Sequence, residues 1–452
     1  MKMYDVIIIG TGQATGTILP ELLEKKLSVA VVEGDRVGGT CVNWGCTPTK
    51  ALVASARAAH MADRGSDFGV EIREKKTNFA RVMERVNDIR NSATSGFRSW
   101  LEEATDFYPG WARFVDSHTV AVGEYEIKGE TIVVHTGARA RSPQVDGIDT
   151  VSWLDNRGLL DLEELPKHLL IVGGSYIGME FGQLFRRLGS EVTILEHGDR
   201  IIFREDPEFS AAAQLVLEHE GVEFKLGSSI TSVEKLPDGV KLLYEQGGEA
   251  REASGSHVLF AIGRIPNSDG INPEAAGLDT NERGYIGVDE YCRTSQPHIY
   301  ALGDVNGKGA FTHTSVHDGQ VFLDHYFKQG RRRNSDRIPT YSMYIDPPLA
   351  RVGMSETVAE RKGIEYQVGS MKMSAVSRAK EKAETDGMMK VVVEKATQQI
   401  LGAAVFGVGG DEIIGMLALA MQAKLPYTKL QETVIPHPTV AELVPYLFAN
   451  LE

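Results

Sequence analysis

Residues 38–50 read GGTCVNWGCTPTK and place Cys41 and Cys46 five positions apart. The run ALVASARAA after Lys50 favours helix, so we expect a helix to begin in this stretch. On one helix the two cysteines would lie within about one and a half turns, and a small rearrangement would bring their sulfurs to bonding distance. Because a helix N-terminus lowers the pKa of a nearby thiol, the spacing predicts a reactive cysteine pair. A structural pair or half of a metal site is the alternative.

The cysteine pair follows a pattern typical of nucleotide binding. Residues 4–9 form a largely β-branched run, as expected of a buried parallel strand, and they lead into GTGQATG. A helix pattern follows, and then a second strand at residues 27–32 that ends at Glu33. This order predicts a βαβ unit whose helix N-terminus receives a dinucleotide.

Individual residues of this turn have separate roles in the prediction. Gly10 permits the tight turn, and Gly12 lets the backbone approach a pyrophosphate. Glu33 would accept hydrogen bonds from a ribose. Thr15 occupies the place of the pattern's third glycine, and Gly16 comes one position later. A glycine-rich turn that binds no ligand is the alternative.

A second unit of the same kind begins at residue 169. Residues 169–172 predict a strand, GGSYIGME predicts the turn and helix start, and a strand at 191–195 ends at Glu196. Ser175 replaces the second glycine of the pattern and needs compatible backbone angles. Two such units in one chain predict two bound nucleotides, one for each unit.

Composition restricts the class of protein further. The 452 residues are 42% hydrophobic and 24% charged, which is ordinary for a globular protein of two to four domains. The net charge of −14 argues against a nucleic-acid partner, and the basic run at 331–333 is expected to be a solvated loop. Three cysteines and the absence of a signal peptide predict a cytoplasmic protein. No run of about 18 apolar residues predicts a membrane span.

The thirteen residues at 38–50 resemble the redox-active signature of the class I flavin-dependent pyridine nucleotide–disulfide oxidoreductases. Glutathione reductase, dihydrolipoyl dehydrogenase and mercuric reductase belong to that family. Four further segments are similar to motifs of the family: TGAR at 136–139, AIGRIPN at 261–267, TSQPHIYALGD at 294–304 and HPTVAE at 437–442. The likeness therefore extends along nearly the whole chain.

The resemblance implies an α/β fold with two Rossmann-like domains and a C-terminal α/β dimerisation domain. FAD would bind residues 1–150 and 270–335, a discontinuous domain. NAD(P)H would bind residues 151–269, and residues 336–452 would form the interface of a homodimer. Strands at 388–393 and 400–406 and a helix at 411–423 are expected in this last domain.

The resemblance also assigns site residues. The catalytic set is Cys41, Cys46, Lys50, Glu180, His437 and Glu442. The FAD set is Gly10, Gly12, Gly16, Glu33, Gly39, Thr40, Lys50, Ala112, Thr136, Gly137, Gly303, Asp304, Phe311 and Thr312. The NAD(P) set is Gly173, Ser175, Tyr176, Ile177, Gly178, Glu196, Gly263 and Arg264. No metal-binding residue is expected.

A two-stage electron relay is the activity that the resemblance implies. NAD(P)H would reduce the flavin, and the flavin would reduce the disulfide between Cys41 and Cys46. Cys46 would lie against the flavin, while Cys41 attacks the substrate and His437 of the partner chain, oriented by Glu442, moves the proton. Lys50 would pair with Glu180 near the flavin ring, and Tyr176 would gate the nicotinamide pocket.

The choice of nicotinamide nucleotide depends on Glu196. A carboxylate at this position accepts hydrogen bonds from the adenosine ribose and repels a 2′-phosphate, which favours NADH. Arg200 and Arg204 lie nearby in the sequence and could serve a phosphate instead.

The electron acceptor stays open. Residues 203–207 and 12–14 resemble segments of mercuric reductase, but residues 447–452 contain no cysteine pair like the one that enzyme uses for its metal. We expect a mercuric-reductase-like enzyme whose acceptor is a disulfide, an oxidised thiol species, a metal ion or a quinone. Dihydrolipoyl dehydrogenase is one alternative, although residues 312–314 depart from its pattern. A flavin-binding redox sensor or partner-binding protein without turnover is another.

Overall fold

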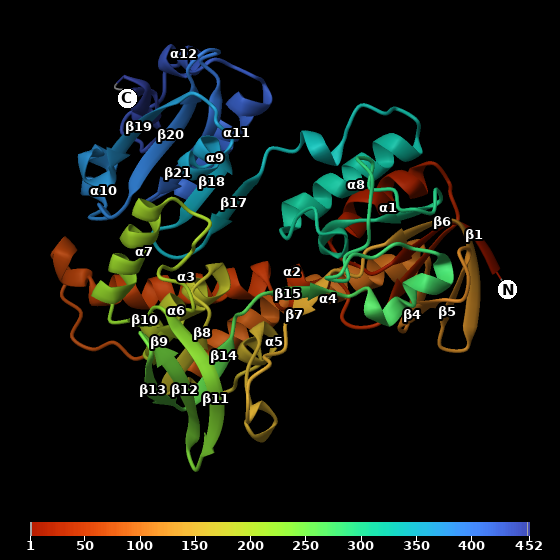
Figure 1. The fold of residues 1–452 in the computed structure, drawn as a ribbon, viewed down its shortest axis with the longest axis horizontal. Helices are drawn as coiled ribbons and strands as arrows, with labels where there is room; N and C mark the ends of the chain where they lie inside the picture. Colours follow the sequence, from red (N-terminus) through yellow and green to blue (C-terminus); the bar gives the residue numbers. More distant parts are fainter. Residues whose placement is uncertain (1, 450) are drawn as a thin grey trace. The chain divides into compact units, whose positions relative to one another are not determined.

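The computed structural model describes residues 2–449 and 451–452, and the chain folds into two compact units (Figure 1). Unit 1 consists of Met1–Ala51, Met83–Ser142 and Ile262–Arg337. Unit 2 consists of Leu52–Val82, Pro143–Ala261 and Ile338–Glu452. Residues 52–82, which the predicted boundaries assign to the flavin domain, thus belong to unit 2, and those boundaries stay a prediction.

Unit 1 is built on a seven-stranded sheet in the order β3-β2-β1-β6-β5-β4, with β16 paired to β6. Strands β1, β2, β3, β6 and β16 run parallel, whereas β4 and β5 are antiparallel to their neighbours. The strands are β1 (Lys2–Ile9), β2 (Val29–Glu33), β3 (Asp106–Pro109), β4 (Ala112–Phe114), β5 (Thr119–Val122), β6 (Tyr125–Val134) and β16 (Ile299–Ala301). The almost entirely apolar run in β1 is buried on both faces, as a central parallel strand requires.

Helices α1 and α8 pack against each other on this sheet. Apolar residues recur at helical spacing on α1, and Ile18 and Leu22 join Phe322 of α8 in one buried cluster. The helices of unit 1 are α1 (Gln13–Glu24), α2 (Gly39–Asn43) and α8 (Thr312–Tyr326), and α3 (Cys46–Asp63) and α4 (Phe79–Ala104) run through both units. A short two-stranded ladder of β7 (Ala138–Ala140) and β15 (Arg264–Pro266) completes the unit.

Unit 2 contains a second parallel sheet in the order β10-β9-β8-β14. A three-stranded antiparallel sheet follows β10 in the chain. The strands are β8 (His168–Val172), β9 (Glu191–Leu195), β10 (Glu223–Lys225), β14 (His257–Phe260), β11 (Ser228–Leu236), β12 (Gly239–Gln246) and β13 (Glu249–Gly255). The helices are α5 (Asn156–Leu160), α6 (Tyr176–Leu188) and α7 (Pro207–His219). The order β8-α6-β9 is the predicted second βαβ unit.

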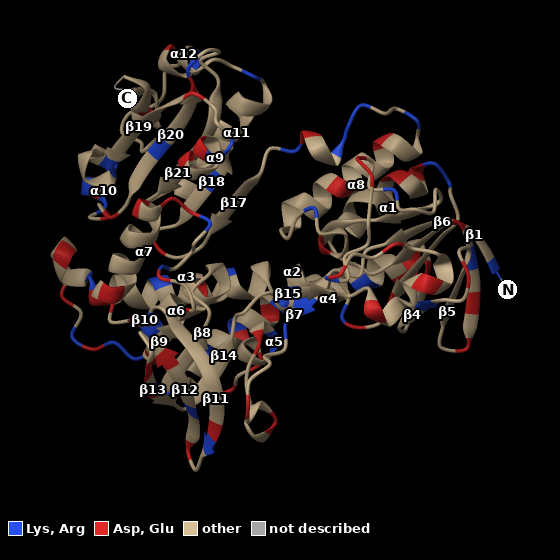
Figure 2. Cartoon of the chain, viewed as in Figure 1, with Lys and Arg blue, Asp and Glu red and all other residues tan. Residues whose placement is uncertain are grey.

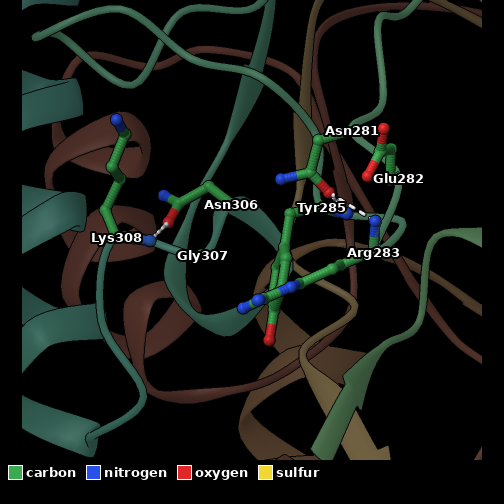
Figure 3. A pocket seen from close by; sticks show the side chains of 7 residues that line it. All are labelled: Asn281, Glu282, Arg283, Tyr285, Asn306, Gly307 and Lys308. Carbon is green, nitrogen blue, oxygen red and sulfur yellow. Dashed lines mark hydrogen bonds between the residues drawn. The ribbon is translucent and has the colours of Figure 1, made fainter.

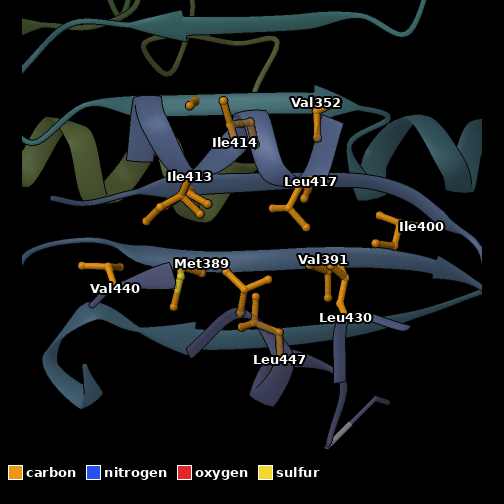
Figure 4. Close-up of a cluster of buried hydrophobic side chains, with 14 of the residues drawn as sticks. Val352, Met389, Val391, Ile400, Ile413, Ile414, Leu417, Leu430, Val440 and Leu447 are labelled. Carbon is orange, nitrogen blue, oxygen red and sulfur yellow. The ribbon is translucent and has the colours of Figure 1, made fainter. Parts of the chain in front are cut away.

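The C-terminal part of unit 2 is a five-stranded antiparallel sheet in the order β17-β18-β21-β20-β19. Figure 4 shows its core, in which Ile413, Ile414 and Leu417 of α11 pack over strand residues such as Met389 and Val391. The strands are β17 (Thr340–Met343), β18 (Leu349–Gly353), β19 (Tyr366–Lys372), β20 (Met388–Glu394) and β21 (Ile400–Phe406). The helices are α9 (Glu356–Arg361), α10 (Ser377–Glu381), α11 (Gly410–Gln422) and α12 (Tyr427–Gln431).

Two nucleotide-binding-type βαβ units and a C-terminal α/β part confirm the predicted fold. Short 3₁₀ turns, the longest at Ala441–Phe448, connect several elements. Acidic and basic residues are interspersed over both units (Figure 2). Within the described residues, no helix combines the length and apolar character needed to cross a bilayer.

Candidate functional site

The two cysteines lie on different helices, which corrects the expectation of one continuous helix. Cys41 is the third residue of α2, a helix of five residues, and Cys46 is the first residue of α3. Gly38 and Gly39, at φ values of +100° and +62°, allow the sharp turn into α2. The structure holds both residues as thiols, and Cys46 Sγ lies 3.3 Å from Thr312 Oγ1 at the start of α8. The predicted disulfide pair is thus brought together beside a predicted flavin residue.

The pKa of Cys41 moves in the direction opposite to the one that the sequence led us to expect. The hydrogen bond with Cys46 raises the pKa of Cys41, and burial of the thiol raises it further. The hydroxyl of Thr312 and the charge of Lys50 act in the opposite direction and are weaker. In the reduced pair, Cys41 therefore holds its proton and shares it with the neighbouring sulfur.

Asn43 fixes the loop that carries the cysteines, and the sequence did not identify it. Its side chain is fully buried, and Nδ2 donates to the carbonyl oxygens of Val37 and Gly39 at 2.9 and 3.0 Å. The hydroxyl of Thr94 on α4 donates to Asn43 Oδ1 at 2.8 Å. A buried amide with these partners holds α2 in one conformation.

The turn between β1 and α1 has the geometry of a dinucleotide-binding turn. Glu33 at the end of β2 accepts hydrogen bonds from the backbone and the hydroxyl of Thr11, at 3.0 and 2.5 Å. The amide of Gly38 in turn donates to the Thr11 hydroxyl at 3.0 Å. Thr11, another residue that the sequence did not identify, thus connects the predicted ribose acceptor to the cysteine loop.

The glycines of this turn differ in what the structure demands of them. A Cβ added at Gly10, where φ is +104°, would lie 2.2 Å from the carbonyl oxygen of His135, so no side chain fits. Gly16 lies inside α1, and its added Cβ would meet only a Phe97 ring carbon at 4.0 Å. Thr15, in the third glycine's place, donates its hydroxyl to the Gly10 carbonyl at 2.8 Å. The predicted role of Gly16 has no packing basis in the structure and stays a prediction.

The segment at 294–304, which includes the predicted flavin residues Gly303 and Asp304, also lies in unit 1, as does Arg264. Arg264 forms an ion pair with Asp304 and donates to the Ala138 carbonyl at 2.7 Å. The sequence grouped Arg264 and Gly263 with the nicotinamide nucleotide, whereas the structure places both in the unit that contains Asp304. The hydroxyl of Thr136 is buried and has no hydrogen-bond partner. An orphaned hydroxyl beside turns that exclude side chains fits a site that receives FAD.

The turn between β8 and α6 repeats this geometry in unit 2. Gly173 has φ of +113°, and an added Cβ at Gly178 would lie 1.9 Å from the Gly173 carbonyl oxygen, so the helix packs tightly on the turn. Ser175 is the N-cap of α6 with φ of −95°, an extended conformation open to any residue. Glu196 accepts from the amides of Gly174 and Gly198, at 2.6 and 2.8 Å. Ser175 thus fits without strain in the place of glycine.

Tyr176, the predicted gate, is anchored at the first position of α6. Its hydroxyl donates to Glu205 at 2.9 Å, and Tyr341 of β17 donates to the same carboxylate oxygen at 2.8 Å. Arg351 pairs with the other oxygen of Glu205 at 2.6 Å. Burial and the neighbouring Glu205 charge raise the pKa of Tyr176, so its hydroxyl stays protonated and donates.

Other predicted catalytic residues also lie in unit 2. Glu180 of α6 accepts from the Tyr344 amide at 2.7 Å. Its predicted ion pair with Lys50 would join the two units and stays a prediction. His437 Nδ1 lies 2.9 Å from Glu442 Oε2, and the His437 side chain is 74% exposed. The pair is therefore formed within one chain and presents its imidazole outward.

The remaining predicted residues divide cleanly between the units. In unit 1 lie Gly12, Gly39, Thr40, Ala112, Gly137, Gly303 and Phe311, and in unit 2 lies Ile177. An open hollow of about 440 Å³ also occurs in unit 1, lined by residues of 281–285 and 306–308 that include Arg283, Tyr285 and Lys308 (Figure 3). None of its lining residues belongs to the predicted site. Among the described residues, no three potential metal ligands cluster.

Comparison with known families identifies the chain. Residues 4–319 match the family described as pyridine nucleotide-disulphide oxidoreductase, and residues 339–447 match its dimerisation domain. The chain belongs to the pyridine nucleotide-disulphide oxidoreductase family. It is thus an oxidoreductase of the flavoprotein disulfide reductase type, and membership implies the use of FAD and a pyridine nucleotide.

Several relatives in this family cover nearly the whole chain. The probable pyridine nucleotide-disulfide oxidoreductase RclA of Escherichia coli (strain K12) is 35% identical over an alignment of 460 positions, which covers 99% of each chain. Dihydrolipoyl dehydrogenase 3 of Pseudomonas putida is 33% identical, covering 100% of this chain and 99% of that one. Mercuric reductase of Bacillus cereus is 32% identical, covering 97% of this chain and 70% of its own length.

A solved structure gives the same relationship. The HOCl-induced flavoprotein disulfide reductase RclA from Escherichia coli matches with a TM-score of 0.90 at 34% identity, and the match covers 99% of each chain. A Cu(II) complex of that protein matches with a TM-score of 0.91. The fold of this pyridine nucleotide-disulphide oxidoreductase therefore corresponds to that of a flavoprotein disulfide reductase along nearly its full length.

Proposed function

We propose that this oxidoreductase uses NADH to reduce a thiophilic acceptor through the Cys41–Cys46 pair. The observation that carries the proposal is the dithiol itself: two hydrogen-bonded sulfurs with Cys46 in contact with Thr312. A redox sensor or binding protein would not need a cysteine pair, an exposed His–Glu pair and two nucleotide turns in one chain. A reductase needs all of them.

The chain's residues divide the proposed reaction between them. Bound FAD supplies a two-electron carrier between the nicotinamide and the disulfide. The hydride of NADH provides two electrons, which break the S–S bond and, with two protons, leave two thiols. The resemblance to the family's signature supports Cys46 as the sulfur beside the flavin, which leaves Cys41 to attack the acceptor. His437, oriented by Glu442, takes the proton that Cys41 must lose to become a nucleophile.

The acceptor is proposed to be a small oxidised sulfur compound or a soft metal ion. A disulfide would receive two electrons and two protons and leave as two thiols while the Cys41–Cys46 bond re-forms. Two Cu(II) ions would instead receive one electron each, and two protons would be released. Thiolates bind soft ions such as Cu(I) well. A Cu(II) complex is known for the related RclA, which makes copper a reasonable acceptor to test here.

NADH is the proposed donor because the Glu196 carboxylate is held at the turn by two backbone amides, where it would repel a 2′-phosphate. Of the nearby arginines, Arg204 lies over the Phe203 ring. Arg200 donates through Nη2 to the Phe203 carbonyl at 2.9 Å, while its buried Nη1 has no hydrogen-bond partner among the described residues. We expect kcat/KM for NADH to exceed that for NADPH at least about tenfold in steady-state assays. A tenfold preference for NADPH would contradict the assignment.

A homodimer with shared active sites is part of the proposal. The dimerisation domain carries large exposed apolar side chains, among them Leu419, Val434 and Tyr446 at 70, 95 and 62% exposure. In the proposed dimer, the second chain would cover side chains of this kind. His437, in the same domain, is exposed while its partner Glu442 is largely buried, as expected of a base that acts on a second chain.

The experiment is anaerobic oxidation of NADH by the purified protein with a panel of acceptors. The panel contains glutathione disulfide, lipoamide, hypothiocyanous acid, Cu(II), Hg(II) and a quinone. One fast acceptor that is lost in Cys41→Ser supports the thiol relay and identifies the substrate class. Activity that survives this substitution would mean that electrons leave directly from the flavin. Fast turnover with lipoamide alone would favour dihydrolipoyl dehydrogenase instead.

A further inference from the structure

Helix α1 begins without a side-chain cap of its own. Its N-cap residue is Gly12, which has no side chain to accept hydrogen bonds from the first turn. The amide of Ala14, in that turn, instead donates to Nε2 of His135 at 3.3 Å. His135 directly follows β6, so a residue 121 positions away supplies the acceptor that Gly12 lacks.

The hydrogen bonds fix the protonation of the His135 ring. Nδ1 lies 2.8 Å from the carbonyl oxygen of Leu302, which can only accept, so Nδ1 carries the proton. Nε2 is then the acceptor for the Ala14 amide and for the Ser315 hydroxyl at 3.4 Å. The neutral ring thus connects α1, the strand end before Asp304 and helix α8.

Three glycines of the predicted FAD set, Gly10, Gly12 and Gly303, pack directly on His135. A Cβ at Gly12 would lie 2.5 Å from His135 Nε2, and a Cβ at Gly303 would lie 2.9 Å from His135 Cε1. A Cβ at Gly10 would collide with the His135 carbonyl oxygen. The imidazole therefore fills the space between the two segments, and those glycines are required partly because the ring is there.

We propose that His135 is a positioning residue of the flavin site, whose neutral imidazole holds the Gly12 turn and the segment at 302–304 in the conformation that binds FAD. The proposal rests on the use of FAD that family membership implies. It assigns a role to a residue outside the predicted site set. It differs from a packing role because it depends on which ring nitrogen carries the proton.

Because the cap requires a neutral ring, protonation of His135 should weaken FAD binding. Burial lowers the pKa of His135, while Glu33, Asp304 and Asp318 around it act to raise the pKa. Arg264 and Arg337 pair with the two aspartates. Protonation would place a hydrogen on Nε2 opposite the Ala14 amide, which is itself a donor, and would remove the cap. Because burial keeps the pKa of His135 below its usual value, FAD affinity is constant at neutral pH and falls only in acid, as the ring protonates.

The test measures FAD binding rather than turnover. Apo-protein is titrated with FAD between pH 4 and 8, and dissociation constants come from the change in flavin fluorescence. His135→Ala should bind FAD at least about tenfold more weakly at pH 8. His135→Asn can still donate to the Leu302 carbonyl but cannot cap α1. It should bind more weakly than wild type, and its affinity should lack the decline that wild type shows in acid.

His257→Asn is the matched control, since burial also lowers the pKa of His257 but the residue lies in unit 2. It should retain wild-type affinity and the wild-type pH profile. If His135→Ala does not fold, His135→Asn decides the question alone. Unchanged affinity in the His135 variants, or an acid decline that persists in His135→Asn, would overturn the positioning role. A wild-type protein that binds no FAD would overturn the cofactor assignment as well.

Discussion

The hydrogen bond between Cys41 and Cys46 should slow the reaction of Cys41 with electrophiles. It is the largest cause of the raised pKa of Cys41, so Cys46→Ala should lower that pKa and increase the thiolate fraction. Alkylation of Cys41 by iodoacetamide in the reduced protein at pH 8, followed by mass spectrometry, should be several-fold faster in the variant than in wild type.

The control for this experiment is a variant that lacks both active-site cysteines. Only Cys292 then remains, and burial raises the pKa of that thiol, so alkylation should be slow. An equal or slower rate for Cys41 in Cys46→Ala would show that the sulfur–sulfur hydrogen bond does not hold the proton.

At the scale of single residues, the sequence identifies the groups that stand at fixed distances from a glycine pattern or from each other. Glu33 and Glu196 were found in this way, and the structure places both carboxylates against their turns. Thr11, Asn43 and His135 carry no such spacing signal. Each is a common polar residue whose role comes from a partner that the fold brings to it, as with His135 and Ala14.

Among the elements, Asp346 connects helices of unit 2 through two ion pairs, of which the one with Arg187 is buried. It lies between β17 and β18 and pairs with Arg57 of α3 and Arg187 of α6, while Glu220 also binds Arg187. Burial alone would raise the pKa of Asp346, but the charges and hydrogen bonds of the two arginines lower it. Such a carboxylate stabilises the fold above its unfolded pKa and loses this contribution as the pH falls through its folded pKa.

Asp346→Asn should therefore destabilise unit 2 by about 3–5 kcal/mol at pH 7, because the buried Arg187 loses one of its charged partners. The difference from wild type should shrink below pH of about 4, where Asp346 of the unfolded chain protonates, and vanish once the folded-state carboxyl protonates at still lower pH. Urea unfolding at pH 7 and at acidic pH measures it. Asp67→Asn removes an exposed pair with Arg64 and should change stability by less than about 1 kcal/mol. A constant difference at all pH values would contradict the prediction.

Elements with a continuous apolar pattern were predicted closely, and polar ones were not. The expected strands at 388–393 and 400–406 correspond to β20 and β21 within one residue. The antiparallel sheet of β11, β12 and β13 was missed, since its outer strand β13 is mostly exposed and carries no apolar alternation. The break between α2 and α3 was missed because helix propensity alone does not reveal the separate five-residue helix before Cys46.

For the whole molecule, the proposed sharing of active sites makes a prediction that one chain alone cannot satisfy. Cys41→Ser and His437→Gln should each be nearly inactive as homodimers. A mixed dimer has one complete site, built from the Cys41 of one chain and the His437 of the other. Unfolding and refolding the two variants together should restore about one quarter of wild-type activity, since half of the dimers are mixed and half of their sites are complete.

The control is each variant refolded alone, which should regain no activity. Sites contained within single chains would give no recovery on mixing.

At the scale of the whole molecule, the sequence predicted the family and the fold well, because its motifs lie along nearly the whole chain. The sequence did not predict that residues 52–82 belong to unit 2, because α3 runs through both units and its composition does not change at Leu52.

Because His135, which follows β6, caps α1, the first nucleotide-binding turn cannot be transferred to another protein by itself. Residues 1–34 contain the strand, the glycines and the acid that define the motif. The acceptor for the Ala14 amide at the helix start, however, is His135, which lies much later in the chain. A graft of this segment onto another scaffold would transfer the motif without its support. The turn can therefore be transferred only together with the segment that contains His135. A residue larger than glycine fits at position 12 only if position 135 becomes smaller at the same time.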